Sequence, residues 1–137
     1  MPAESAVSIA IESDADVVTA RQRAREMAIA LDLSSTDQTL LATAISEVAR
    51  NITTYARRGE VSVGIVRDGA GRRGIRVVAS DQGPGIEDVE RAMQDGYTTG
   101  GGLGLGLPGA RRLVDDFALD SEPGRGTTVT LVKWSRT

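Results

Sequence analysis

The sequence predicts an α+β fold: a two-layer sandwich with helices packed on one face of a mixed, mainly antiparallel sheet. Stretches of alternating polar and apolar residues are joined as neighbours by turn-like segments, which is typical of hairpins. Two long helical patterns precede the hairpins and do not alternate with the strands, which disfavours a doubly wound fold. The chain has 137 residues. We expect one domain over residues 1–137, because this length suffices for one buried core.

The first half of the chain predicts a strand and two helices. Alternation over residues 7–11 indicates a short, half-buried strand. Apolar periodicity predicts helices over residues 16–31 and 37–56. Residues 34–37 (Ser-Ser-Thr-Asp) supply good helix-start side chains, and Gly59 follows two arginines as a plausible stop.

The second half predicts two hairpins separated by helical and glycine-rich segments. Both hairpins have turns made of glycine with aspartate or proline, which favour reversal of the chain. The expected elements are strands 61–66 and 75–79, a short helix 86–93, a glycine-rich segment 95–107, a helix from Pro108 to about residue 116, and strands 117–121 and 127–134.

Composition excludes several classes of chemistry. The chain has no cysteine and no histidine, so thiol catalysis, thiolate or histidine metal sites and Ser-His-Asp catalysis are impossible. The net charge of −3 gives no general attraction to nucleic acid or anionic membrane, so we expect neither as a partner. The sequence lacks a signal peptide pattern and any apolar run of membrane-spanning length. We therefore expect a cytoplasmic protein.

The second predicted helix carries a carboxylate and a carboxamide one turn apart. Glu47 and Asn51 are spaced i and i+4, so both project from the edge of its apolar face. A carboxamide oxygen suits a hard cation such as Mg²⁺, and a carboxylate can orient or deprotonate a nucleophile. The alternative is that both side chains simply cap the rim of the core.

An aspartate followed by two glycines comes directly after a predicted strand. Asp81 begins the run Asp-Gln-Gly-Pro-Gly, which ends at Gly85. A carboxylate at a strand end can hold a planar amine such as that of adenine, and nearby glycines let the backbone approach a flat ring. Ordinary turn chemistry would also explain the glycines and the proline.

Glycine is concentrated late in the chain. Seven of the 16 glycines lie between Gly96 and Gly109, directly before a predicted helix. Free backbone N–H groups and a helix N-terminus can together bind phosphate. The alternative is a flexible surface loop, because glycine is costly to order. Further on, Gly124-Arg-Gly-Thr127 reads as a hairpin turn that leads a threonine hydroxyl into the last strand.

Two common nucleotide motifs do not apply. Gly104 to Gly109 matches G-x-G-x-x-G, but no predicted strand precedes it, as the dinucleotide fingerprint requires. No P-loop sequence exists, and the only lysine of the chain is Lys133. P-loop enzymes and ordinary protein kinases are therefore disfavoured.

Taken in order, these four segments resemble the motifs of the GHKL ATPase superfamily, whose Bergerat fold is a two-layer α/β sandwich. Glu47–Asn51 looks like its N box, Asp81–Gly85 like its D-x-G-x-G box, Gly100–Gly106 like its glycine lid box and Gly124–Thr127 like its final G-x-G-T. Nearly the whole chain is similar to the RsbT-type serine/threonine kinases of bacterial stressosomes, including the ending Val132-Lys133-Trp134.

The resemblance implies a role for each matching residue. Glu47 would be the catalytic base and Asn51 the Mg²⁺ ligand. Asp81 would bind the adenine amino group, with Thr127 reaching the ring through water. Arg50 receives no role, because its i+1 spacing from Asn51 points it elsewhere. The residues that would contact ATP are Asn51, Asp81, Gly83, Gly85, Gly102, Leu103, Gly104, Gly106 and Thr127.

The same resemblance implies partners and leaves alternatives open. The substrate would be a serine or threonine of a STAS-domain antagonist protein, after which the kinase would bind a downstream phosphatase or another regulator. One alternative is an RsbW-type anti-sigma factor that acts mainly by binding. Another is a nucleotide-binding switch module without chemistry. A sensor histidine kinase is disfavoured, because the chain has no histidine and no room for a dimerisation helix pair.

Overall fold

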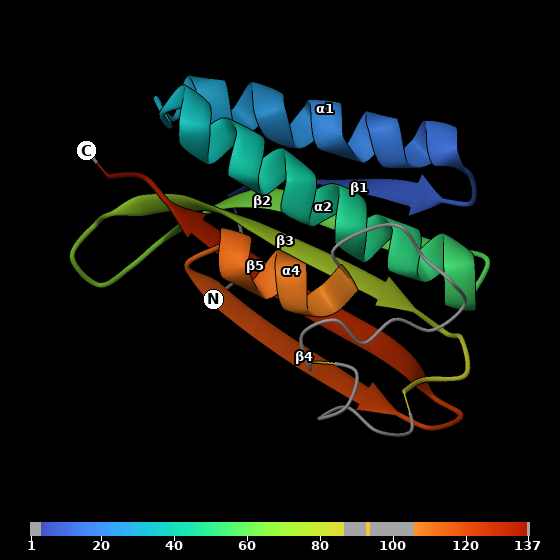
Figure 1. Ribbon diagram of the computed structural model, residues 1–137. Coiled ribbons are helices and arrows are strands. Elements are labelled where there is room, and N and C mark those ends of the chain that lie inside the picture. Colours follow the sequence, from blue (N-terminus) through green and yellow to red (C-terminus); the bar gives the residue numbers. More distant parts are fainter. Residues whose placement is uncertain (1–3, 87–92, 94–105, 137) are drawn as a thin grey trace.

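The computed structural model describes residues 4–86, 93 and 106–136 (Figure 1). These residues form a five-stranded sheet and three helices, the expected α+β arrangement. In chain order the elements are β1 (Glu4–Ile11), α1 (Asp14–Ala30), α2 (Ser35–Tyr55), β2 (Gly59–Arg67), β3 (Arg73–Asp81), α4 (Gly106–Leu113), β4 (Asp116–Glu122) and β5 (Gly126–Trp134). The helix expected over residues 86–93 and most of the glycine-rich segment lie outside the described residues.

The sheet has the order β1-β2-β3-β5-β4, and every neighbouring pair is antiparallel. The expectation of a mixed sheet is therefore wrong for the described strands. The reason lies in the connections: between β1 and β2 the chain passes through two helices, each of which reverses its direction, so β2 returns antiparallel to β1. A single crossover helix would have produced a parallel pair. β1 and β4 form the two edges of the sheet.

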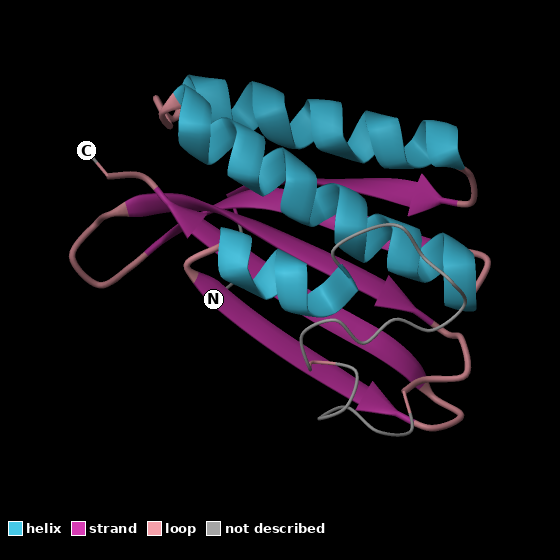
Figure 2. Cartoon of the chain, viewed as in Figure 1, coloured by secondary structure: helices cyan, strands magenta, loops and turns pink. Residues whose placement is uncertain are grey.

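All three helices lie on one face of the sheet, as expected (Figures 1 and 2). Strand alternation sends every second side chain into the layer between helices and sheet. The largest fully buried side chains are Ile11, Leu41, Ile45, Val48, Ile52, Val61, Val63, Ile75, Val77 and Leu131. This core is continuous from α1 and α2 to strands β1, β2, β3 and β5.

The same alternation places polar residues at both ends of the buried rows. On β3 the helix-facing row runs Ile75, Val77, Ala79 and ends at Asp81. The paired row on β5 starts at Thr127, opposite Asp81, and ends at Lys133, opposite Ile75. All three polar side chains are buried. The core is therefore bounded by an aspartate and a threonine at one end and by a lysine at the other.

The start of α2 confirms the expected cap, but its end differs from the prediction. The Ser34 hydroxyl accepts a hydrogen bond from the backbone N–H of Asp37, 3.0 Å away. After α2, Arg57 and not a glycine takes the left-handed conformation, with φ of 71°. Gly59 is instead the first residue of β2, where a Cβ atom would collide with the carbonyl oxygen of Ser80. The glycine is thus required by close packing between strands.

Helix α4 also differs from its predicted bounds. It begins at Gly106, two residues before Pro108, and ends at Leu113 rather than near residue 116. Proline is tolerated in the first turn because N–H groups there have no partner within the helix. The helix cannot extend to residue 116, because β4 begins there. The final hairpin of β4 and β5 is confirmed.

Candidate functional site

Glu47 lies in the C-terminal half of α2 and is only 9% exposed. Its Oε2 atom accepts a hydrogen bond from the backbone N–H of Gly106, at 3.1 Å. Gly106 is the first residue of α4, 59 positions further along the chain. The predicted acid–base carboxylate and the N-terminus of the helix after the glycine-rich segment are therefore in direct contact. Asn51, one turn further along α2, is half-buried.

Arg50, for which the sequence predicted no role, lies beside Glu47. Its Nη1 atom lies 3.7 Å from the Oε1 atom of Glu47, and its side chain is 55% exposed. Residues three apart on a helix are neighbours, and Arg50 lies three residues after Glu47. The spacing from Glu47 to Arg50 is the signal that would have found the pair. The guanidinium places a positive charge on the solvent side of the buried carboxylate.

Asp81, the last residue of β3, shapes the turn that follows it. Its Oδ1 atom accepts a hydrogen bond from the backbone N–H of Gly83 at 2.9 Å. A Cβ atom at Gly83 would press on Ala56 at the end of α2, and one at Gly85 would collide with the carbonyl oxygen of Glu122. Packing alone therefore requires both glycines. Their contact with a nucleotide stays a prediction.

Thr127 and Ser121 share a hydroxyl network beside Asp81. The Ser121 hydroxyl accepts from the backbone N–H of Ile86 at 2.8 Å and donates to the carbonyl of Gly126 at 3.1 Å. Its oxygen lies 2.9 Å from that of Thr127. Because serine has one hydroxyl hydrogen, Thr127 is the donor to Ser121 whenever Ser121 donates to Gly126. Sequence reasoning missed Ser121, which no motif marks.

We expect two glycine substitutions in the same turn to differ sharply in their effect on stability. Gly124 and Gly126 both have positive φ, 81° and 101°, but a Cβ atom at Gly124 meets nothing within 4 Å. At Gly126 it would collide with the carbonyl oxygen of Asp81. Gly124→Ala should cost about 1–2 kcal/mol from backbone strain alone. Gly126→Ala should cost at least about 3 kcal/mol, because the collision adds to that strain.

Denaturant unfolding of the two variants measures this difference in the free energy of unfolding. Equal losses would show that the tight contact between β3 and the β4–β5 turn does not restrict residue 126.

The described site residues belong to α2, β3, α4, β5 and the turn after β3, and the end of α2, the end of β3, the start of α4 and the start of β5 lie toward the same end of the sheet (Figure 1). A Cβ atom at Gly59 would lie 2.9 Å from the side chain of Ile52 and 3.1 Å from that of Asp81. Ile52, the residue after Asn51, therefore lies close to the end of β3. The remaining predicted contacts, Gly102, Leu103 and Gly104, lie outside the described residues.

The sequence matches the family of histidine kinase-, DNA gyrase B- and HSP90-like ATPases over residues 36–136. The chain belongs to this ATPase family. The match includes α2 and every strand after it, and so contains all the site residues described above.

Within the ATPase family, the chain is 46% identical to the serine/threonine-protein kinase RsbT of Bacillus subtilis over 128 residues, covering 93% of this chain and 96% of that one. This likeness confirms the expectation of a serine/threonine protein kinase. The chain is also 33% identical to the anti-sigma F factor of Caldanaerobacter subterraneus over 95 residues, 67% of this chain and 66% of that one.

Solved structures of more distant proteins share this fold. The RsbU and RsbW domains of a Mycobacterium tuberculosis protein match with a TM-score of 0.65 and 21% identity, over 100% of this chain and 34% of that one. The mycobacterial sensor histidine kinase MprB matches with a TM-score of 0.57 and 20% identity, over 95% and 99%. At these identities the likeness supports the fold alone.

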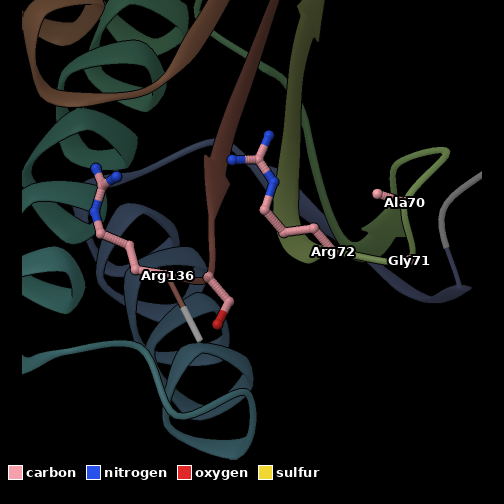
Figure 3. Close-up of a pocket in the computed structure, with 5 residues that line it drawn as sticks. Ala70, Gly71, Arg72 and Arg136 are labelled. Carbon is pink, nitrogen blue, oxygen red and sulfur yellow. The ribbon is translucent and has the colours of Figure 1, made fainter.

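A separate hollow lies at the β2–β3 turn (Figure 3), and this turn is at the opposite end of β3 from Asp81 (Figure 1). It has a volume of about 570 Å³ and is lined by the β2–β3 turn and the C-terminal residues, including Arg72 and Arg136. Arg72 is already paired with Asp68 at 3.0 Å and stacked on Trp134. The backbone N–H of Arg72 donates to Asp68 and lowers the pKa of that carboxyl group. These contacts account for Arg72 as part of the turn structure.

In the part of the chain that the structure describes, no helix is both long enough and apolar enough to cross a bilayer.

Proposed function

We propose that this protein transfers the γ-phosphoryl group of ATP to a serine or threonine of a STAS-domain antagonist protein, in a bacterial stressosome or sigma-factor regulatory pathway. The observation that carries the proposal is the contact between Glu47 and the N–H of Gly106. It joins a buried carboxylate to the N-terminus of α4, and a helix N-terminus favours the binding of phosphate. The likeness to RsbT and to anti-sigma F factors supports the regulatory setting.

Glu47 is proposed as the base for the substrate hydroxyl. A base must lie within hydrogen-bond reach of the proton that it removes. Phosphate bound at the N-terminus of α4 would place the reacting phosphorus beside this carboxylate, since Gly106 already touches it. Phosphoryl transfer depends mainly on position and on neutralisation of charge. The exposed guanidinium of Arg50 adds positive charge at the same place.

The described residues fit a magnesium ion that arrives with ATP. Among them, no group of three or more acidic side chains could hold a metal ion by itself. Mg²⁺ needs no such cage, since it keeps several waters and is commonly bound by one or two protein oxygens together with substrate phosphates. The carboxamide oxygen of half-buried Asn51, one turn from Glu47, is the proposed protein ligand. The ion would neutralise charge on the phosphates.

Asp81 is proposed to select adenine. One of its carboxylate oxygens holds the turn through Gly83. A carboxylate accepts hydrogen bonds at two oxygens, so the second oxygen of Asp81 is proposed to accept one from the exocyclic amino group of adenine. Thr127, the register partner of Asp81 on β5, is proposed to reach the ring through water. Gly83 and Gly85 keep the following backbone close to this position.

The test of the proposed function is a transfer assay with a defined acceptor. The protein is mixed with magnesium, labelled ATP and a STAS-domain protein recovered with it by pull-down from its native cytoplasm. We expect label on a serine or threonine of the STAS protein. Tight ATP binding without any labelled acceptor would favour a nucleotide-binding switch module instead. The cytoplasmic location and the binding of a downstream phosphatase or another regulator are further parts of this proposal.

The 33% identity to an anti-sigma F factor favours one second candidate, an RsbW-type protein that acts by binding a sigma factor. Immobilised protein and purified sigma factors distinguish the two functions. Stable capture of a sigma factor, with release on addition of a STAS protein, would make this second function the better account.

A further inference from the structure

Helix α4 is held at both ends by polar contacts with the rest of the molecule. At its N-terminus, the N–H of Gly106 donates to Glu47 at 3.1 Å. At its C-terminus, the carbonyl of Leu113 accepts a hydrogen bond from the Nζ atom of Lys133 at 3.2 Å. The last carbonyls of a helix have no partner within the helix, so a cation there satisfies one of them and interacts favourably with the helix dipole.

Each of these two contacts connects α4 to α2, one directly and the other through Lys133. Glu47 lies on α2 itself, and Lys133 Nζ lies 3.5 Å from Asp37 in the first turn of α2. The ten residues from Asp37 to Glu47 rise about 15 Å, and the eight residues of α4 rise about 12 Å. Helix α4 therefore runs antiparallel to α2, with one end at the carboxylate of Glu47 and the other at that of Asp37.

Lys133 is the only lysine of the chain and is only 4% exposed. It occupies the last helix-facing position of the β5 row, opposite buried Ile75, where an apolar side chain would extend the core. Its charge is balanced by Asp37 and by Asp115, 3.9 Å away. Replacing a buried ion pair with apolar groups is often neutral for stability or favourable. The contacts of the ammonium group with Leu113 and Asp37 therefore explain its presence better than its contribution to stability does.

Arg136 meets the same two carboxylates from the solvent side. It lies 3.4 Å from Asp37 and 3.2 Å from Asp115, and its side chain is 63% exposed. The hydrogen bond to the carbonyl of Leu113, however, comes from Lys133. The two cations therefore share their acidic partners and differ in whether they hold α4.

We propose that Lys133 is a positioning residue for α4, and that it keeps the N–H of Gly106 on the carboxylate of Glu47 by fixing the opposite end of the helix. A shift of α4 along its axis would strain the hydrogen bond between Lys133 and the carbonyl of Leu113. The consequence for catalysis rests on the proposed function, but the effect on α4 does not.

Two charge-balanced double variants test the proposal. D37N/K133M and D37N/R136M each remove one cation and the Asp37 charge, and only the first removes the contact with Leu113. Hydrogen exchange is followed by NMR at the Gly106 amide and at the central Val77 amide. We expect exchange at Gly106 to be at least about tenfold faster in D37N/K133M than in D37N/R136M, with equal exchange at Val77. Equal exchange at Gly106 would overturn the proposal.

If D37N/K133M does not fold, two single variants carry the same test. Lys133→Gln and Arg136→Gln each remove one cation from Asp37 and Asp115, and only Lys133→Gln shortens the side chain that reaches the carbonyl of Leu113. Faster exchange at Gly106 in Lys133→Gln alone supports the proposal, and the same rate in both variants contradicts it.

Kinetics separates this proposal from the proposed function. We expect kcat for phosphoryl transfer to be about tenfold lower in D37N/K133M than in D37N/R136M, because misplacement of a catalytic group lowers the rate. If the wild-type protein transfers no phosphate but the exchange rate at Gly106 still differs between the two double variants, the proposed function fails and the positioning role stands. If the wild type is active and the two exchange rates at Gly106 are equal, the positioning role fails.

Discussion

Replacing Glu47 with glutamine should lower the rate of phosphoryl transfer by about 10²- to 10⁴-fold, the usual contribution of a general base. The substitution removes the basic oxygen and the ion pair with Arg50, but a carboxamide oxygen can still accept the N–H of Gly106. Helix α4 should therefore stay in place, and the affinity for ATP should change little. Single-turnover transfer of labelled phosphate and calorimetric ATP binding measure the two quantities.

The matched control is Glu60→Gln. Glu60 is an exposed glutamate of β2 that interacts with Ser8 on the sheet edge. The Glu60→Gln substitution removes one carboxylate from the protein without changing the candidate site, so the transfer rate of this variant should equal that of the wild type. Retention of full activity in Glu47→Gln would show that the carboxylate only holds α4, and the base would have to be sought elsewhere.

Asparagine in place of Asp81 should weaken ATP binding by roughly 10- to 100-fold. A hydrogen bond to a charged group contributes about 1.5–3 kcal/mol, which corresponds to this range of affinity. The asparagine carboxamide oxygen can still accept the N–H of Gly83, so the turn is preserved. Its NH₂ group would meet the amino group of adenine donor to donor. Titration calorimetry with ATP measures the loss.

A ligand without the amino group makes this test specific. Purine riboside triphosphate, which lacks it, should bind the wild type and Asp81→Asn with nearly equal affinity. Asp120→Asn, on the exposed side of β4, is the matched control and should leave both affinities unchanged. The same loss for both ligands in Asp81→Asn would assign Asp81 a structural role and remove it from adenine recognition.

Local patterns in the sequence predicted most of the described elements and named the residues of the candidate site. Alternation along β3 and β5 decides which side chains face the helices, and Asp81 and Thr127 belong to the buried rows. The spacing of Glu47 and Asn51 placed both on α2. Each of these signals is contained within a few residues, and each depends on the geometry of one strand or one helix.

Contacts between distant segments could not be read in this way. Nothing near Lys133 in the sequence indicates that its ammonium group meets Asp37 and the carbonyl of Leu113. The contact of Glu47 with Gly106 depends on how α4 lies along α2, which no local pattern encodes. The antiparallel pairing of β1 and β2 likewise followed from the number of intervening helices, and Ser121 mattered only because two distant segments, at Ile86 and at Gly126–Thr127, meet at its hydroxyl.

The place of β4 at the edge of the sheet has a consequence for self-association. An edge strand offers unpaired backbone groups that can recruit a strand from another molecule, and proteins commonly protect such edges with charge. On β4 the residues that alternate toward solvent include Asp116, Asp120 and Glu122. A second copy adding its own β4 alongside would bring carboxylates opposite carboxylates, which is unfavourable. The acidic residues of β4 therefore disfavour the addition of further strands, and so fibrous aggregation, at this edge of the sheet.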